Sequence, residues 1–478
     1  MYIAKRLLLL CSALLISFRC LEYVYEIENE VQSKDALLVI GILSAQNNYA
    51  ARNSVRQTWK SFTEQRKIKF FFLVGTGVCP IHPYDRKSDL SCEALDLTSF
   101  YDRVWVPAVP DSKENFKPSK LWITSFTFRV NFPVIVRGIR VLKEAVPKSI
   151  QGYVRLKNAR TGKIVTSSPA LPLLSNGTTW QEIPIEPVIL PKSFDLEVEL
   201  SNEAFDSSKM LEECHLESSW FNFSGGIEFT TLYSPDRGWV TFNEKSCATV
   251  SLLLELHDRA KYLMEREVRS LQWQKQIVLL EESLRNEANI EKDIVLLDVL
   301  DVYKNIPTKL LQFYKWAFEN LNFTFLLKSD DDTFLDIPII EQYLKSVMVA
   351  NEQIHDDSYM WWWGNLRHGL PVERHGKWQE LEFAAPVYPP FPCGGGYVLN
   401  KNIVRFLAKN SKWLHTFQGE DTSLGIWLSG IHPDTPKDAL CHWACGEECG
   451  KQSCNRGQLS VEAMSSVWKH YQKNHKLC

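Results

Sequence analysis

The sequence predicts an α/β fold with a mostly parallel sheet that is interrupted by an all-β, sandwich-like insert. Apolar stretches typical of buried strands lie at 36–43, 68–74, 294–300 and 323–327, and segments with helical periodicity stand between them. Strands and helices that alternate in this way form parallel sheets, because each helix carries the chain back to the same edge. Residues 116–247 differ: apolar and polar residues alternate there between prolines and glycines, which is typical of a β-sandwich.

The chain therefore divides into five predicted parts. These are a targeting segment at 1–20, the first part of the α/β domain at 36–115, the β-rich insert at 116–247, the second part of the α/β domain at 250–435 and a Cys-rich C-terminal segment at 436–478. The charged stretch 251–289, directly after the insert, is expected to be a helix.

The composition is that of a globular protein with sizeable cores. The chain has 478 residues, 45% of them hydrophobic, which is enough for two or three domains. Its 54 Lys and Arg residues against 57 Asp and Glu residues give a formal net charge of −3, and there is no basic stripe. We therefore expect no nucleic-acid partner.

The N-terminus has the pattern of a secretory targeting segment. Lys5 and Arg6 precede an apolar run at 7–18, which is shorter than the ~20 residues that a spanning helix usually needs. The run is either a cleaved signal peptide or a short signal anchor, and both deliver the rest of the chain to the secretory lumen. Glycosylation sequons at Asn176 and Asn222 agree with that compartment.

Twelve cysteines also favour an oxidising compartment, in which an even number of them predicts disulfides. Cys79 and Cys92 are close enough in sequence to form a local bridge. The cluster at 441–454, which includes His442, has a zinc site as its alternative. Its C-x3-C-x3-C-x4-C spacing lacks the usual pairs of CxxC, so disulfides are favoured there.

Three consecutive carboxylates follow the apolar strand at 323–327. In α/β proteins ligands bind outside the carboxyl ends of the strands, which is where Asp330, Asp331 and Asp332 would lie. The three acids would repel each other unless a cation lay among them. Oxygen ligands suit Mg²⁺ or Mn²⁺, and these ions commonly bridge to phosphates. The pattern predicts a metal–diphosphate site, with a solvated acidic turn as the alternative.

Two arginines lie on the helix expected after the first strand, at 48–62. Arg52 and Arg56 are four residues apart and share one face of that helix. A helix in this position is a usual place for phosphate, which the planar guanidinium group of arginine binds well. The alternative is a solvated basic face.

Two later motifs also have functional interpretations. Gly394, Gly395 and Gly396, between prolines and an apolar strand, predict an ordered turn in which a ligand can approach the main chain. Glu420 and Asp421 stand at the N-terminus of a short helix, where a carboxylate is either a helix cap or a catalytic base.

Together these motifs resemble the β-1,3-glycosyltransferases of the galactosyltransferase group, in which they occur in the same order. The matching motifs are Arg-Asn-Ser-Val-Arg-Gln-Thr-Trp at 52–59, Lys-Ser-Asp-Asp-Asp at 328–332, Tyr-Pro-Pro-Phe-Pro-Cys-Gly-Gly-Gly-Tyr-Val-Leu at 388–399 and Glu-Asp-Thr-Ser-Leu-Gly at 420–425. The resemblance covers about residues 36–110 and 250–430. It implies a type A, Rossmann-like nucleotide-sugar-binding fold in a type II membrane protein of the Golgi or endoplasmic reticulum, with the catalytic part in the lumen.

The resemblance also implies a role for each motif residue. Asp332 and Asp330 would bind Mn²⁺ or Mg²⁺, with Asp332 the more direct ligand, and Asp421 would be the catalytic base with Glu420 supporting it. The remaining positions would bind the donor, namely Arg52, Arg56, Lys328, Asp331, Gly394, Gly395 and Gly396.

The implied reaction is an inverting transfer of N-acetylgalactosamine from UDP-GalNAc to the 3-hydroxyl of a β-linked GlcNAc. The acceptor would be a glycan or glycoprotein, such as an O-mannosyl glycan, and the N-terminal segment would anchor the enzyme in the membrane. Within the family the chain is most similar to a member that transfers N-acetylgalactosamine and has a long insert at the same place. Galactose or GlcNAc transfer is an alternative, and so is an inactive luminal lectin-like or scaffold protein that binds through its β-rich insert.

Overall fold

The computed structural model describes residues 36–64, 66–95, 97, 103–107, 121–142, 152–169, 180–201, 226–234, 238–240 and 246–478, the last range with gaps at 351–353, 355, 375–376, 437, 447–448 and 451. The predicted targeting segment and the sequons at Asn176 and Asn222 lie outside these residues. Among the residues described, no helix is both long enough and apolar enough to cross a membrane.

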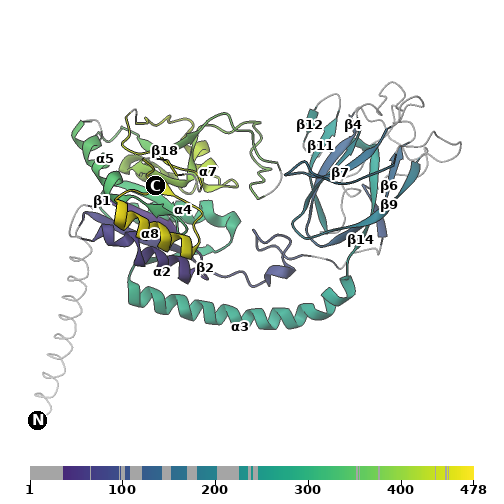
Figure 1. Cartoon of the computed structure of the whole chain (residues 1–478), viewed down its shortest axis with the longest axis horizontal. Helices are drawn as coiled ribbons and strands as arrows, with labels where there is room; N and C mark the ends of the chain where they lie inside the picture. The colour runs from purple at the N-terminus through teal and green to yellow at the C-terminus, as the bar shows by residue number, and fades with distance from the viewer. Residues whose placement is uncertain are drawn as a thin grey trace, which may run out of the picture.

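One lobe of the molecule is built on a six-stranded sheet (Figure 1). The strand order is β15 (Ile294–Leu300), β2 (Ile68–Gly77), β1 (Ala36–Leu43), β16 (Phe323–Asp330), β19 (Phe391–Asn400) and β18 (Trp362–Arg367). The pairs β15–β2, β2–β1 and β1–β16 are parallel, whereas β16–β19 and β19–β18 are antiparallel. The predicted mostly parallel α/β sheet is therefore confirmed, with antiparallel pairing confined to one edge.

Helices cover both faces of this sheet. Residues of α2 (Tyr49–Gln57), α5 (Ile337–Ala350) and α8 (Val461–Asn474) share one hydrophobic cluster, and residues of α4 (Ile306–Asn320), α6 (Lys401–Asn410) and α7 (Glu420–Leu428) share the other. Successive residues of β1 contribute to opposite clusters, Ile40 and Ile42 to the first and Val39 to the second, because side chains alternate along a strand. All eight residues of β1 are buried, as the continuous apolar run predicts.

The β-rich insert forms the second lobe. One antiparallel sheet contains β12 (Gly238–Val240), β11 (Ile227–Ser234), β5 (Ser125–Val130), β10 (Asp195–Leu200), β7 (Val154–Asn158) and β8 (Ile164–Ser167). A second contains β3 (Arg103–Val106), β14 (Val250–Leu256), β6 (Val134–Leu142) and β9 (Trp180–Leu190), and β13 (Ser246–Ala248) pairs with β4 (Leu121–Ile123). Both larger sheets contribute to one hydrophobic core, for example through Phe126 of β5 and Leu252 of β14, as expected of a sandwich.

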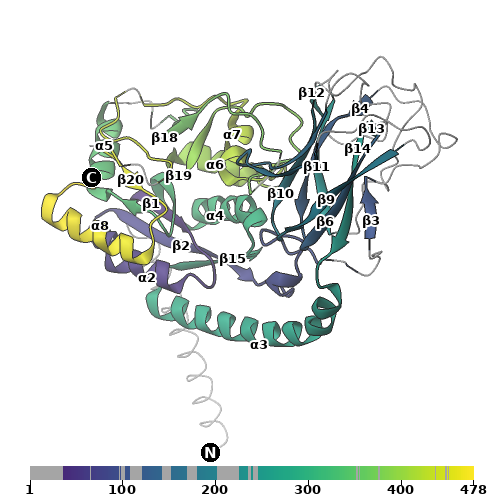
Figure 2. The ribbon, with the colours of Figure 1, turned by 45° about the vertical axis from the view of Figure 1, so that its right-hand side comes forward.

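Two boundaries differ from the expectation. Strands β3 and β14 belong to the insert, so the β-rich unit extends beyond the predicted 116–247 on both sides. The expected helix at 251–289 begins only at α3 (Arg259–Glu291), because residues 250–256 pair with β6 and bury alternate side chains. Helix α3 then runs beneath both lobes (Figure 2), and Trp273 and Arg269 fasten it to the loop after β2 through the carbonyl of Cys79 and the carboxylate of Asp85.

The C-terminal segment is part of the α/β lobe. Strand β20 (Asn455–Arg456) pairs with β17 (Phe334–Leu335), and Trp468 and Tyr471 of α8 pack on Phe62 with ring centres 5.2 Å away in both cases. Three disulfides, Cys393–Cys445, Cys441–Cys454 and Cys449–Cys478, hold the segment in place. The preference for disulfides over zinc in this cluster is confirmed, and so is the local bridge between Cys79 and Cys92.

Candidate active site

A pocket of about 830 Å³ opens where β1 and β16 end. This volume lies in the range of sites for small ligands, and the site is where the strand order changes direction, since β2 and β16 flank β1 on opposite sides. Its wall is formed by residues after β1, by the start of α4, by the three aspartates after β16, by β19 and by the N-terminus of α7. The pocket therefore collects motifs that are up to about 380 residues apart in sequence.

The three consecutive aspartates have different surroundings. Asp331 accepts hydrogen bonds from the Ser44 hydroxyl at 2.7 Å and the Asn48 amide at 3.0 Å, so it fastens the loop between β1 and α2. Asp330 forms an ion pair with Lys328 at 2.9 Å and keeps about a third of its side chain exposed (34%). Asp332 also lines the pocket. Asp330 and Asp332 are thus the two carboxylates of the cluster that remain for a ligand.

Lys328 is a buried cation beneath the pocket. Its ammonium group lies 2.7 Å from Glu420 Oε1 and 2.9 Å from Asp330 Oδ1, and it donates to the carbonyl of Gly394. Burial disfavours the charged ammonium, but the two carboxylates outweigh burial and raise its pKa. Lys328 therefore joins the acidic end of β16 to the acidic start of α7.

Glu420 and Asp421 are the first two residues of α7, and their pKa values shift in opposite directions. Burial opposes ionisation of Glu420, but the charge of Lys328 outweighs it and lowers the pKa of this carboxyl. Burial, followed by the negative charge of Glu420, raises the pKa of Asp421 to about 7, although the backbone N–H groups of Thr422 and Gly394 stabilise its charged form at 2.8 and 3.1 Å. Asp421 is thus a pocket carboxylate that gains and loses a proton near neutral pH, as a general base does.

The three glycines lie within strand β19, not in the turn that the sequence predicted. A Cβ on Gly394 would be 2.8 Å from Glu420 Oε1, and one on Gly395 would be 2.9 Å from the carbonyl of Ala444. A Cβ on Gly396 would be 2.6 Å from the Trp443 ring. The glycines allow the carboxylates of α7 and the C-terminal segment to lie directly on the strand. Gly394 and Gly395 line the pocket, whereas Gly396 packs behind it.

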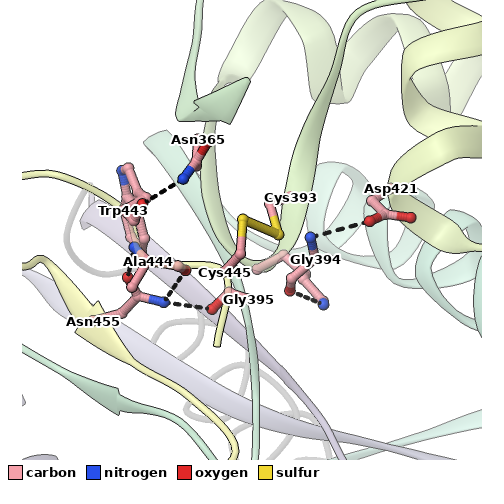
Figure 3. The surroundings of a disulfide bond; sticks show 10 residues. Asn365, Cys393, Gly394, Gly395, Asp421, Trp443, Ala444, Cys445 and Asn455 are labelled. Atoms are coloured by element: carbon pink, nitrogen blue, oxygen red, sulfur yellow. Dashed lines mark hydrogen bonds between the residues drawn. A yellow bond between two sulfur atoms is a disulfide. The ribbon is translucent and has the colours of Figure 1, made fainter. Parts of the chain in front are cut away.

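Figure 3 shows how the C-terminal segment completes this wall. The Cys393–Cys445 disulfide joins it to β19, and the Asn455 amide donates to the carbonyls of Gly395 and Ala444 at 2.9 and 3.0 Å. Cys393 and Cys445 both line the pocket. The Cys-rich segment therefore contributes residues to the wall of the pocket.

The structure places Arg52 and Arg56 differently from the expected contact with the nucleotide. The guanidinium group of Arg52 is buried and bound to both oxygens of Glu287, at 2.8 and 2.6 Å, and it also donates to the carbonyl of Ala45. Arg56 pairs with Glu287 and with Asp293 at 2.7 Å. Neither arginine lines the pocket, because Glu287 of α3 and Asp293, which follows that helix, hold them away from it. Arg52 instead binds the loop after β1 through its hydrogen bond to Ala45, and that loop lines the pocket.

Sequence reasoning missed several residues that build this site. Asn48, which begins α2 and binds Asp331, carried the signal of a helix-start residue. Glu287 pairs with an arginine 235 residues away, and no local pattern marks such a contact. Tyr303 and Trp378 line the pocket as well.

The donor set fits a divalent cation that is shared with a ligand. Within the described ranges, no group of three or more His, Cys, Asp and Glu residues is placed to hold a metal by itself. Asp330 and Asp332 supply two carboxylates in the pocket. Mg²⁺ and ions like it are commonly bound by one or two carboxylates together with substrate phosphates. The residues present therefore fit a metal that binds together with a diphosphate.

An α/β sheet that carries, in one pocket, two carboxylates suited to a metal-bound diphosphate and a further carboxylate with a raised pKa fits a glycosyltransferase that uses a nucleotide sugar. Comparisons of sequence support this class. The profile described as Galactosyltransferase matches residues 275–435, which contain the aspartates of β16, the glycines of β19 and the start of α7.

Relatives of one name match over nearly the whole chain, and another matches over a shorter region. UDP-GalNAc:beta-1,3-N-acetylgalactosaminyltransferase 2 of Mus musculus is 31% identical over 457 residues, covering 90% of this chain and 86% of the relative. The protein of the same name from Xenopus tropicalis is 32% identical, covering 91% and 90%. Beta-1,3-galactosyltransferase 6 of Mus musculus is 33% identical over a shorter region, 29% of this chain and 42% of the relative. The chain belongs to the galactosyltransferase family of glycosyltransferases and resembles its β-1,3-N-acetylgalactosaminyltransferase 2 members over their length.

Proposed function

We propose that the protein transfers N-acetylgalactosamine from UDP-GalNAc to the 3-hydroxyl of a β-linked GlcNAc, with inversion at the anomeric carbon. The observation that carries this proposal is the position of Asp421, a carboxylate with a pKa of about 7 in the same pocket as Asp330 and Asp332. The names of the full-length relatives support this donor and this linkage.

In this mechanism each group of the chain has one task. Asp330 and Asp332 hold the divalent cation, which when bound neutralises the charge that develops on the UDP leaving group. Asp421 removes the proton of the acceptor hydroxyl, so the oxygen attacks the sugar from the face opposite UDP. Lys328 keeps Glu420 ionised and in place, and the negative charge of Glu420 keeps Asp421 basic enough to accept the proton.

UDP release by the purified luminal part, residues 21–478, tests the proposal. UDP-GalNAc, UDP-GlcNAc and UDP-Gal are supplied in turn with a β-GlcNAc glycoside, with Mn²⁺ and then with a chelator. We expect release that needs both acceptor and metal with UDP-GalNAc. Release with another donor would assign another sugar, and a folded protein that binds no UDP would favour the lectin-like alternative.

We further propose that the protein is a single-pass type II membrane protein of the Golgi or endoplasmic reticulum, with a type A fold in the lumen. Its four disulfides among the described residues support an oxidising compartment. A loss of glycan mass in the Asn176→Gln and Asn222→Gln variants would place the insert in the lumen. Equal mobility of both variants and wild type after expression in cells would count against it.

A further inference from the structure

The long loop between β18 and β19 contributes residues to the pocket and is closed at its base by two backbone hydrogen bonds. The N–H of Val372 donates to the carbonyl of Pro386 at 3.0 Å, and the N–H of Tyr388 donates to the carbonyl of Leu370 at 2.9 Å. Leu370 and Tyr388 line the pocket at this base. The described residues of this loop are therefore part of the pocket wall.

Glu380 ties this loop to the helix that carries the base. Its side chain is 3% exposed, and Oε1 accepts from the N–H of Phe383 at 2.9 Å. Its other oxygen accepts from the N–H of Gln418 at 2.6 Å, two residues before α7 begins. The Glu380 carboxylate therefore holds this loop in a defined position relative to the start of α7, where Asp421 lies.

The same loop presents an exposed indole to the pocket. Trp378 lines the pocket with 59% of its surface exposed, although an exposed indole forfeits hydrophobic free energy. Its Nε1–H donates to the hydroxyl of Tyr303 at 3.1 Å, and the ammonium of Lys377 lies 4.6 Å from the centre of the Tyr303 ring. The indole is thus anchored through its Nε1–H, the Lys377 ammonium lies 5.9 Å from its ring centre, and more than half of its surface stays exposed.

Tyr303 lines the same pocket as Glu420 and Asp421 and lies within reach of their charge. Burial, together with the negative charge of Glu420, raises the pKa of Tyr303 to about 12, so the phenol keeps its proton at neutral pH. The bond from Trp378 uses a lone pair of the phenol oxygen, so the O–H can still donate to a ligand. An oriented aromatic surface and a hydroxyl donor thus lie beside the base.

We propose that Trp378 is the platform on which the acceptor sugar stacks, with Tyr303 as the positioning residue that fixes its indole. The proposal rests on the transfer reaction proposed above. A β-linked GlcNAc has equatorial ring substituents, so it presents flat C–H faces that complement an aromatic ring. The platform lies on the loop tied to α7, and the acceptor is the substrate whose hydroxyl must reach Asp421.

The alternative is that the uracil ring of the donor stacks on the indole. If the acceptor sugar stacks there, a substitution of Trp378 weakens acceptor binding; if uracil stacks there, it weakens UDP binding. The test therefore measures binding of a β-GlcNAc glycoside to the luminal protein loaded with UDP and Mn²⁺, by calorimetry, beside binding of UDP itself. We expect Trp378→Ala to raise the Kd for the glycoside about tenfold, as the loss of a stacked aromatic does, and to change the Kd for UDP less than twofold. Trp378→Phe should recover most of the glycoside affinity.

The chain offers a matched control. Trp413 is 86% exposed and does not line the pocket, so Trp413→Ala should leave both dissociation constants unchanged. Tyr303→Phe keeps the aromatic ring but removes the hydroxyl, and it should weaken glycoside binding by a smaller factor than Trp378→Ala while leaving UDP binding unchanged.

The dissociation constants test the stacking platform independently of the transfer reaction. A glycoside Kd that is unchanged in Trp378→Ala overturns the platform, whatever the enzyme transfers, and so does a wild type that binds no glycoside. A UDP Kd that rises instead assigns the indole to the uracil and also overturns it. A wild type that binds the glycoside through Trp378 but transfers nothing would contradict the reaction and leave the platform supported.

Discussion

The substitution Glu420→Gln isolates the electrostatic link between the two carboxylates of α7. Glutamine keeps the shape of the side chain and an oxygen that can accept from Lys328, but it removes the negative charge next to Asp421. That charge is the second-largest cause of the raised pKa of Asp421, after burial. Without it the ionised form of Asp421 is easier to reach, so the pKa of Asp421 falls.

The size of this shift follows from the geometry. Glu420 Oε1 and Asp421 Oδ2 lie 2.8 and 3.4 Å from the place where a Cβ on Gly394 would stand, so the two oxygens are about 6 Å apart at most. Two unit charges about 6 Å apart at an effective dielectric constant of about 20 interact by about 3 kcal/mol, or about two pKa units. Lys328 offsets part of this repulsion, so we expect a fall of about one unit.

The assay is the pH dependence of kcat/KM for the donor between pH 5 and 9, at saturating Mn²⁺. The wild type should lose activity as the pH falls through about 7, because Asp421 becomes protonated. In Glu420→Gln the acidic limb should lie about one unit lower, so the fraction of plateau activity left at pH 6 rises from about one tenth to about one half. Glu382→Gln removes a carboxylate that is 71% exposed outside the pocket and should leave the limb in place. An acidic limb that is the same in Glu420→Gln and wild type would refute this electrostatic link.

Three further experiments test the architecture of the site. Gly394→Ala should lower kcat at least about tenfold, since its Cβ would stand 2.8 Å from a catalytic carboxylate oxygen, whereas Gly430→Ala, with nothing within 4 Å, should keep wild-type kcat in the same assay. Lys328→Met leaves two carboxylates without their buried cation and should lower the free energy of unfolding in urea by about 3–5 kcal/mol; an unchanged urea midpoint would contradict the ion-pair network. Arg52→Lys and Glu287→Gln should both weaken UDP binding in calorimetry, because each loosens the pocket loop; weakening in the arginine variant alone would show a direct contact with the nucleotide.

Much of the fold could be predicted because its signals are local. The apolar run of β1 identifies a strand buried on both faces, and the alternating pattern of the insert identifies half-buried strands such as β7 and β10. The stretch 250–256 was mistaken for the start of a helix because its pairing partner, β6, is more than 100 residues away. The glycines of β19 resembled a turn because nothing nearby in sequence shows that Trp443 and Glu420 lie directly over them.

In the candidate site, too, local signals were predictable and long-range contacts were not. The sequence brought the three aspartates and Asp421 to attention through local chemistry, and the structure places them in one pocket. It did not distinguish Asp331, which binds the loop after β1, from its neighbours, because that difference depends on Ser44 and Asn48. Long-range partners decide which charged groups face a ligand.

The substitution Asp421→Asn shows whether Asp421 is the base that activates the acceptor. The amide keeps an oxygen for the N–H of Gly394 or Thr422 but cannot take the acceptor proton. We predict that the variant binds UDP and Mn²⁺ within about twofold of wild type while its transfer rate falls by a factor of about 10²–10⁴. Transfer at the wild-type rate by Asp421→Asn would contradict the account and assign the base elsewhere.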